Sequence, residues 1–141
     1  MKRKIFLERI DLGEQGCHLF CKGSIHHHSI RILIDTGASK SVLSSHMAEQ
    51  LPSLRQVHLA DNETSGIGPE KLTAEFVQLS RLRVGNVRLN HLIVGVMNLD
   101  HVTALYERMG YQPFDFILGG DILDACRAQI DYRKLVMYLR S

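Results

Sequence analysis

The clearest hydrophobic pattern in the chain is an alternation with a period of two. In residues 30–34 an isoleucine stands at every second position, with Arg31 and Leu33 between, and the run ends at Asp35. Such a period is typical of a β-strand. The apolar residues around it predict a strand that ends inside the core, with Asp35 directly after it. Similar runs predict three further strands, at residues 92–96, 129–132 and 135–139.

Residues 82–89 predict a β-hairpin, because two short alternating runs flank a central Gly-Asn pair. The register of this hairpin places Val84 opposite Val87 and Arg83 opposite Arg88. Like charges that face each other destabilise a sheet. We therefore expect this face to be open to solvent, with a basic contact surface as the alternative.

Helices are predicted to be few and short. Residues 45–51 form the first, which ends before Pro52, since proline restricts the residue that precedes it. Residues 101–109 form the second, with Asp100 as its N-cap and Gly110 as its C-terminal stop.

A third helix is predicted to follow Asp121 and to continue through Ala128. Together with the strands, this gives a mainly β fold with two or three short helices. The chain has no low-complexity linker and no shift in composition, so we expect one domain over residues 1–141.

The composition narrows the functional classes. Of the 141 residues, 45% are hydrophobic and 23% are charged, which excludes a disordered or fibrous chain. The net charge of +2 is too small to predict binding to nucleic acid or to a membrane surface. No apolar run approaches the roughly 20 residues of a transmembrane helix, and Glu8, Arg9 and Asp11 interrupt the segment where a signal peptide is apolar. We expect a cytoplasmic protein.

The cysteines do not suggest a disulfide framework. Cys17 and Cys21 lie four residues apart in a predicted strand, which places them about 13 Å apart. A disulfide requires Cα atoms within about 7 Å. The chain has three cysteines and no CxxC spacing, so we expect reduced thiols that pack as small hydrophobic side chains.

Three consecutive histidines, His26, His27 and His28, suggest a metal site at first sight. Adjacent strand residues point to opposite faces, so only His26 and His28 could share a metal ion. The sequence places no cysteine or carboxylate cluster where it would complete such a site. A solvated turn at a hairpin tip is favoured, and we expect no metal and no cofactor.

Two segments carry the chemistry. In residues 32–39 (ILIDTGAS) a carboxylate, a hydroxyl and a glycine directly follow an apolar strand. There Asp35 would be partly desolvated, Thr36 could hydrogen-bond to the segment opposite, and Gly37 would permit a tight turn. Residues 114–123 repeat the pattern of an apolar run, glycine and helix. Aligned on their glycines, the two segments look like a weak internal duplication.

In this alignment Ile117 stands where the first segment has Asp35, so only the first segment keeps the acid. The alternative is that Asp35 is a turn residue without chemistry. The second segment would then be a coincidence.

Residues 32–39 and 116–121, with the ending at residues 128–139, resemble the retropepsin-like aspartic proteases, and the ending is similar to bacterial members. The resemblance implies a closed, barrel-like β fold with one lobe per chain. It also implies a homodimer that hydrolyses peptide bonds, because a pair of aspartates is needed and this chain has one DTG. Each chain would supply Asp35, and no metal or covalent intermediate is required.

The resemblance also assigns roles to individual residues. Asp35, Thr36 and Gly37 would form the catalytic loop, and Ser39 would hydrogen-bond the outer oxygen of Asp35. Gly66 and its neighbours would form the flap, a hairpin tip that closes over the substrate. The residues implied in substrate binding are Ala38, Ser39, Gly66, Ile67, Gly68 and Ile117.

Two departures from the family pattern keep a second function open. Many retroviral members have arginine at the position of Gly120, where it supports the dimer, and the flap has Pro69 instead of a second consecutive glycine. The alternative to a protease is therefore an inactive dimeric domain that binds peptides or a partner protein.

Overall fold

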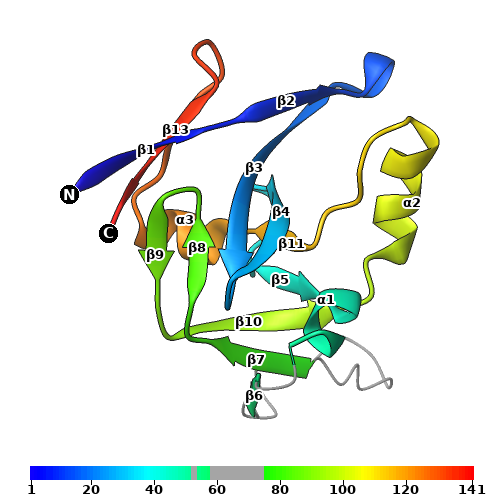
Figure 1. The fold of residues 1–141 in the computed structure, drawn as a ribbon. Helices are drawn as coiled ribbons and strands as arrows, with labels where there is room; N and C mark the ends of the chain where they lie inside the picture. The colour runs from blue at the N-terminus through cyan, green and yellow to red at the C-terminus, as the bar shows by residue number, and fades with distance from the viewer. Residues whose placement is uncertain (52–53, 58–74) are drawn as a thin grey trace.

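The computed structural model describes residues 1–51, 54–57 and 75–141. Most of the regular structure is strand (Figure 1). The strands are β1 (Lys2–Phe6), β2 (Glu8–Asp11), β3 (Cys17–Ile25), β4 (His28–Ile34), β5 (Val42–Ser44), β6 (Arg55–Val57), β7 (Glu75–Leu79), β8 (Leu82–Val84), β9 (Val87–Leu89), β10 (Leu92–Met97), β11 (Phe116–Leu118), β12 (Gln129–Asp131) and β13 (Val136–Arg140). The helices are α1 (Ser45–Glu49), α2 (Asp100–Arg108), α3 (Gly120–Ala125) and the 3-10 turn η1 (Gly13–Gln15).

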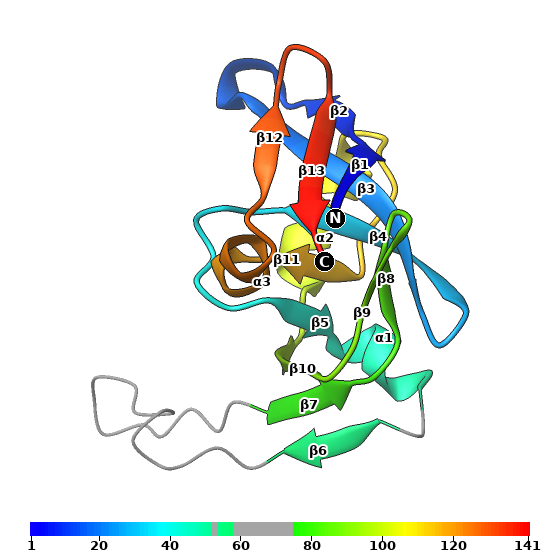
Figure 2. The same ribbon diagram turned by 90° about the vertical axis from the view of Figure 1, so that its left-hand side faces the viewer.

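The strands form two sheets. In the larger sheet the order is β6-β7-β10-β5-β11-β4-β3-β8-β9, with β2 paired to β3, and this sheet curls into a half-barrel. The smaller sheet has the order β1-β13-β12 and brings the two ends of the chain side by side (Figures 1 and 2). The expectation of a mainly β fold is confirmed.

Both faces of β4 are buried, and this positions the strand that leads to Asp35. Ile30, Ile32 and Ile34 belong to the main core, which also takes in residues of both sheets. Leu33 points to the other side, into a second apolar cluster with Phe20 and the side chains of α2 and of the segment after it. Because of this second cluster, β4 ends in apolar surroundings, and Asp35, the next residue, is partly desolvated, as the apolar run predicts.

The predicted hairpin registers are confirmed. In the β8–β9 hairpin Val84 pairs with Val87 and Arg83 pairs with Arg88. The histidine tract also lies at a hairpin tip, because β3 and β4 are joined through His26.

The first two helices differ from the prediction at their ends. Helix α1 stops at Glu49, two residues before the predicted end, and Ser44 caps it by accepting a hydrogen bond of 3.1 Å from the Met47 amide. Asp100 is the first residue of α2, not its N-cap as predicted. The carboxamide of Asn98 accepts from the Asp100 amide at 2.8 Å, so the side chain that serves this helix start lies two residues earlier.

The third helix was predicted too late in the chain and too long. Helix α3 begins at Gly120, so Asp121 lies inside it, and it ends at Ala125 rather than at Ala128. The main-chain contacts of Gly120 with the Asp35 loop, described below, determine the earlier start. Among the helices described, none is long and apolar enough to cross a membrane.

The sequence pattern gave no sign of β1. Its basic residues Lys2, Arg3 and Lys4 are exposed, and Ile5 is the one buried residue of the strand. With a single buried position there is no period to detect. Strand β1 is held instead by antiparallel pairing with β13, from the opposite end of the chain.

All three cysteines are free thiols, in agreement with the prediction. Cys21 on β3 is 4% exposed and belongs to the main core. Burial raises the pKa of the Cys21 thiol from 9.0 to about 12, because the thiolate would be desolvated there.

We expect the substitution Cys21→Val to protect the fold at alkaline pH. Because its pKa is raised, Cys21 keeps its proton in the folded chain at pH values above 9, where the unfolded chain loses it. The contribution of Cys21 to the free energy of unfolding is therefore complete below pH 9 and is lost as the pH rises toward 12. The loss is about 1.4 kcal/mol per pH unit. Urea unfolding between pH 7.5 and 10.5 should show a steeper loss for the wild type than for Cys21→Val. Equal slopes would contradict the assignment.

Candidate active site

The two glycine-containing segments of the sequence lie side by side. Strand β11 runs parallel to β4, with Phe116 beside Ile32 and Leu118 beside Ile34. The Asp35 amide donates to the Leu118 carbonyl at 3.0 Å. Two loops that are more than 80 residues apart in the sequence therefore leave neighbouring strands at the same point.

The loop after β4 holds the Asp35 carboxylate in one orientation. Its Oδ1 accepts a hydrogen bond of 3.0 Å from the Gly37 amide, and the Asp35 carbonyl accepts from the Ala38 amide at 3.2 Å. The side chain is half-buried. Within the described residues nothing donates to Oδ2, so the second oxygen is left for a water molecule, a substrate or a second chain.

The remaining loop residues lie around this carboxylate. Thr36 and Gly37 are exposed, and Thr36 lines a hollow of about 260 Å³ together with residues of α3. Ser39 is exposed, and its main-chain carbonyl accepts from the Asp121 amide at 3.2 Å. No hydrogen bond joins its hydroxyl to Asp35 in the described part of the chain, where the Gly37 amide is the group that contacts the carboxylate.

The other predicted substrate contacts lie elsewhere. Ile117 is half-buried and packs against the second apolar cluster, at the level of Leu33 on the neighbouring strand. The expected flap residues Gly66, Ile67 and Gly68 fall outside the described residues.

A buried serine joins the two loops, and the sequence analysis missed it. Ser41 is fully buried, and its hydroxyl donates to Asp121 Oδ1 at 2.7 Å. The Ser41 amide donates to the same oxygen at 3.0 Å. The Ser41 hydroxyl also accepts a hydrogen bond of 2.8 Å from the Gly119 amide. The hydroxyl, both amides and the carboxylate form one network, which we call the Ser41–Asp121 lock.

The close approach of the two loops requires glycine at position 119. A Cβ atom there would lie 2.7 Å from the Ala38 carbonyl oxygen and 3.0 Å from the Lys40 backbone. The Gly120 amide donates to the same Ala38 oxygen at 2.6 Å. The main chain of Gly120 thus braces the Asp35 loop within one chain.

A tyrosine of α2 lies within electrostatic reach of Asp35. Tyr106 is 2% exposed, packs edge-on against Phe20 and Phe114, and shares a hydrogen bond with His18 Nδ1. Burial, and secondly the negative charge of Asp35, raise the pKa of Tyr106. Sequence reasoning assigned His18 no partner, since the two residues are 88 positions apart.

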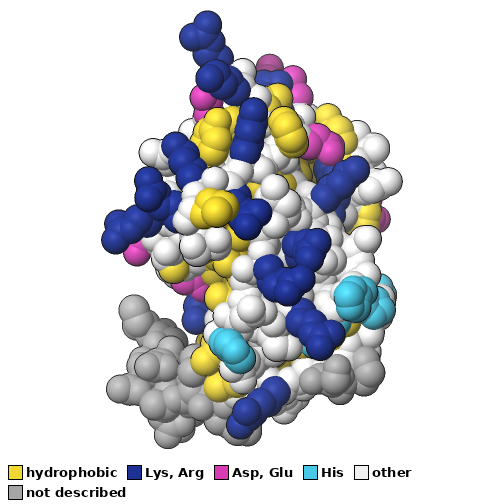
Figure 3. Space-filling view, turned by 60° about the vertical axis from the view of Figure 1, so that its left-hand side comes forward, with side chains coloured by type: hydrophobic (Ala, Val, Ile, Leu, Met, Phe, Trp, Pro, Cys, Tyr) yellow, Lys and Arg dark blue, Asp and Glu magenta, His cyan; other side chains and the backbone are white. Residues whose placement is uncertain are grey.

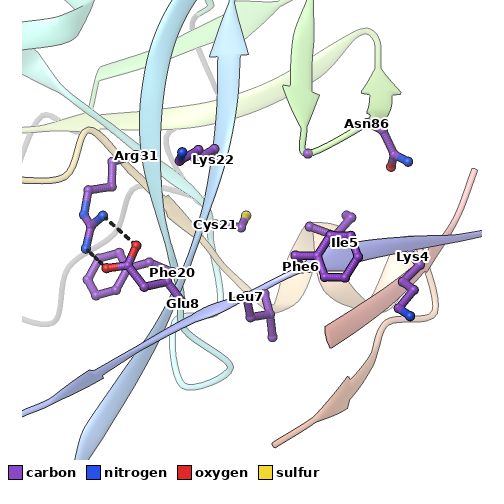
Figure 4. Close-up of a pocket in the computed structure, with 11 residues that line it drawn as sticks. Lys4, Ile5, Phe6, Leu7, Glu8, Phe20, Cys21, Lys22, Arg31 and Asn86 are labelled. Carbon is purple, nitrogen blue, oxygen red and sulfur yellow. Dashed lines mark hydrogen bonds and ion pairs between the residues drawn. The ribbon is translucent and has the colours of Figure 1, made fainter. Parts of the chain in front are cut away.

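A separate hollow of about 420 Å³ lies between β1, β3, β4 and the tip of the β8–β9 hairpin (Figure 4). Arg31 crosses its rim, pairs with Glu8 at 3.2 Å and lies 4.5 Å over the ring of Phe20. Cys21 is also part of its wall. None of the loop residues around Asp35 contributes to this hollow, so we assign it no part in the chemistry.

Comparison with known proteins supports the relationship that the two loops suggest. A model of the aspartyl protease family matches residues 21–122, which include both loops and the strands that carry them. The chain belongs to the aspartyl protease family. In the part of this family member that the structure describes, no group of three or more His, Cys, Asp or Glu side chains is arranged to hold a metal ion.

Solved structures share the fold. A retropepsin-like aspartic protease from Rickettsia conorii covers 99% of this chain and 91% of its own, with a TM-score of 0.59 and 18% identity. The retroviral protease-like domain of Ddi1 from Leishmania major covers 82% of this chain and 79% of its own, with a TM-score of 0.54 and 18% identity. The retropepsin-like fold expected from the sequence is therefore confirmed.

Curated relatives match over most of this chain. Protein DDI1 homolog 2 is 23% identical over 125 residues in Mus musculus and 23% identical over 121 residues in Homo sapiens. These matches cover 89% and 86% of this chain, but 28% and 27% of the relatives. The chain thus spans little more than a quarter of their length.

Proposed function

We propose that the protein is a homodimeric aspartic endopeptidase in which each chain contributes Asp35 to one active site. The observation that carries this proposal is the placement of Asp35 where β4 and β11 end together, with Oδ1 fixed by the Gly37 amide and Oδ2 without a donor among the described residues. Family membership supports a peptidase. No cofactor enters the proposed mechanism.

The chemistry follows from two carboxylates that face one water molecule. Two carboxyl groups that face the same water molecule lie too close together for both to be ionised, so the pair shares one proton. The ionised carboxylate takes a proton from the water as it attacks the peptide carbonyl, and the protonated one donates to the carbonyl oxygen. Proton transfer to the leaving nitrogen then breaks the C–N bond. Thr36 of each chain would reach across the twofold axis to the other loop and hold the two carboxylates coplanar, and Gly37 would let the two loops approach closely.

The small sheet supports a dimer. The large apolar side chains of Met1, Phe6 and Tyr132 are 82%, 75% and 61% exposed on or beside its strands. Strands β1 and β12 each have one neighbour within the described chain, so each leaves one edge free for a partner. Burial of this apolar surface and pairing of the edges would stabilise the association.

The proposed activity is tested by incubating the full chain with a diverse mixture of unstructured peptides between pH 3 and pH 8. We expect internal cleavage products, whose masses identify the cleaved bonds by mass spectrometry. A folded, dimeric protein that cleaves nothing at any pH but binds the peptides would contradict the proposal. It would support the inactive binding domain instead.

A further inference from the structure

Three arginines line a groove at the turn between β3 and β4. In the sheet, Ser24 pairs with Arg83, and Arg83 pairs with Arg88, so the three residues form one row across β3, β8 and β9. Directly opposite residues of antiparallel strands point to the same face. Both arginines are exposed on it.

This groove, which we call the arginine groove, is built to hold negative charge. It has a volume of about 660 Å³ and is lined by Arg81, Arg83, Arg88, His27, Leu82 and hydroxyl or amide side chains. None of the described residues that line it carries a carboxylate. Figure 3 shows the side of the molecule that carries the β8–β9 hairpin, where several Lys and Arg side chains lie near the middle of the view, His side chains lie to the right and lower left, and acidic side chains lie mainly toward the top and left.

The groove costs the fold free energy in two ways. Arg83 and Arg88 face each other with like charge, which destabilises the hairpin. His26 and His27 both have positive φ, of 48° and 72°, in a turn where glycine or asparagine is favoured. The His26 amide, which donates to the Arg81 carbonyl at 3.3 Å, fixes this turn beside the groove. An anion bound between the arginines would offset the repulsion.

The arginine groove is remote from the proposed active site. It lies at the His28 end of β4, whereas Asp35 follows Ile34 at the other end. A seven-residue strand is about 20 Å long. A ligand in the groove therefore leaves the Asp35 carboxylate accessible.

From these observations we infer that the arginine groove binds an acidic, extended polypeptide segment. Strand β9 is the last strand of its sheet in the described chain and leaves one edge free, where an extended peptide can add as a further strand. Arginine binds carboxylates through two parallel hydrogen bonds. Among the described residues that line the groove there is no Phe, Tyr or Trp, the large side chains on which single-stranded nucleic acid stacks its bases. This inference does not depend on proteolytic activity.

The test uses the full chain with Asp35→Asn, so that the probe cannot be cleaved. The probe is a fluorescently labelled ten-residue peptide of alternating glutamate and valine, followed by fluorescence anisotropy in 50 mM salt. We expect saturable binding that weakens at 300 mM salt. The double substitution Arg83→Gln with Arg88→Gln should weaken binding at least tenfold.

The matched control is Arg133→Gln, which removes one exposed arginine from the β12–β13 turn and should change the affinity less than twofold. Thermal unfolding shows whether each variant is folded. Arg83→Gln alone should raise Tm by about 1 °C, because it removes a like-charge pair. Unchanged affinity in the folded double variant would overturn the inference. So would equally tight binding of a ten-nucleotide oligothymidine, which would indicate a nucleic-acid surface.

Discussion

Asp35→Asn is expected to lower kcat/KM for peptide hydrolysis by a factor of about 10⁴ or more, because it removes both the proton acceptor and the shared proton of the dyad. The fold should survive, since an asparagine Oδ1 can still accept the hydrogen bond from the Gly37 amide that Asp35 Oδ1 accepts at 3.0 Å. The measurement compares initial rates on one cleaved peptide, together with the sedimentation coefficient and Tm of both proteins.

The control is Glu14→Gln, which changes an exposed carboxylate of the 3-10 turn η1 and should leave kcat/KM within about twofold. If Asp35→Asn retained activity at a tenth of the wild-type rate, the hydrolysis would belong to another group, and the proposed mechanism would be wrong.

Asp121→Ala is expected to have the largest effect on stability. It removes the acceptor of two hydrogen bonds, from the hydroxyl and the amide of the fully buried Ser41. Buried donors without partners cost about 1–3 kcal/mol each, so for two donors we expect the free energy of unfolding to fall by about 2–6 kcal/mol. The Asp35 loop would also lose the side-chain part of its connection to α3, while the main-chain bonds of Gly120 and Asp121 remain, which should lower kcat more than it raises KM.

Urea unfolding measures this loss, with Asp124→Ala as the control from the same helix. We expect the control to change stability by less than about 0.5 kcal/mol, because its side chain is exposed. The double variant of Asp121→Ala with Ser41→Ala should be much less than additive, since both remove the same network. Full additivity would mean that the Ser41–Asp121 lock is not one unit.

The local signals in the sequence were sufficient for the central strands and for Asp35. The alternating run before Asp35 and the Gly-Asn pair of the β8–β9 hairpin each depend on neighbours a few residues away. Such patterns reflect burial and turn geometry directly. The strand before Asp35 and the hairpin register could therefore be predicted, whereas the pairing of the two glycine segments, more than 80 residues apart, comes from the folded structure.

The features that were missed depend on contacts between distant segments. Ser41 is held by Asp121, 80 residues away, and nothing beside it in the sequence indicates that it is buried. The β1 strand has one buried residue and is determined by its pairing with β13. Helix α3 begins at Gly120 because the Ala38 carbonyl holds that amide. Each depends on partners that only the folded chain brings together.

Each chain has one DTG segment, whereas the proposed reaction uses two carboxylates. In the proposed mechanism the second acid comes from a partner chain, so a mixed dimer with one Asp35 and one asparagine should be inactive. When wild-type and Asp35→Asn chains are mixed, the activity per wild-type chain should fall in proportion to the chance that a wild-type chain pairs with a variant chain. An active site complete in one chain would be unaffected by its partner.

The most direct measurement is therefore activity after wild-type and Asp35→Asn chains are mixed unfolded at a ratio of 1:9 and refolded together. With random pairing, about one wild-type chain in ten has a wild-type partner, so activity per wild-type chain should fall to about a tenth. Mixing with active Glu14→Gln chains should instead leave the activity per total chain within about twofold of the wild type, because every dimer then keeps two Asp35 carboxylates. Undiminished activity per wild-type chain in the Asp35→Asn mixture would contradict the shared active site.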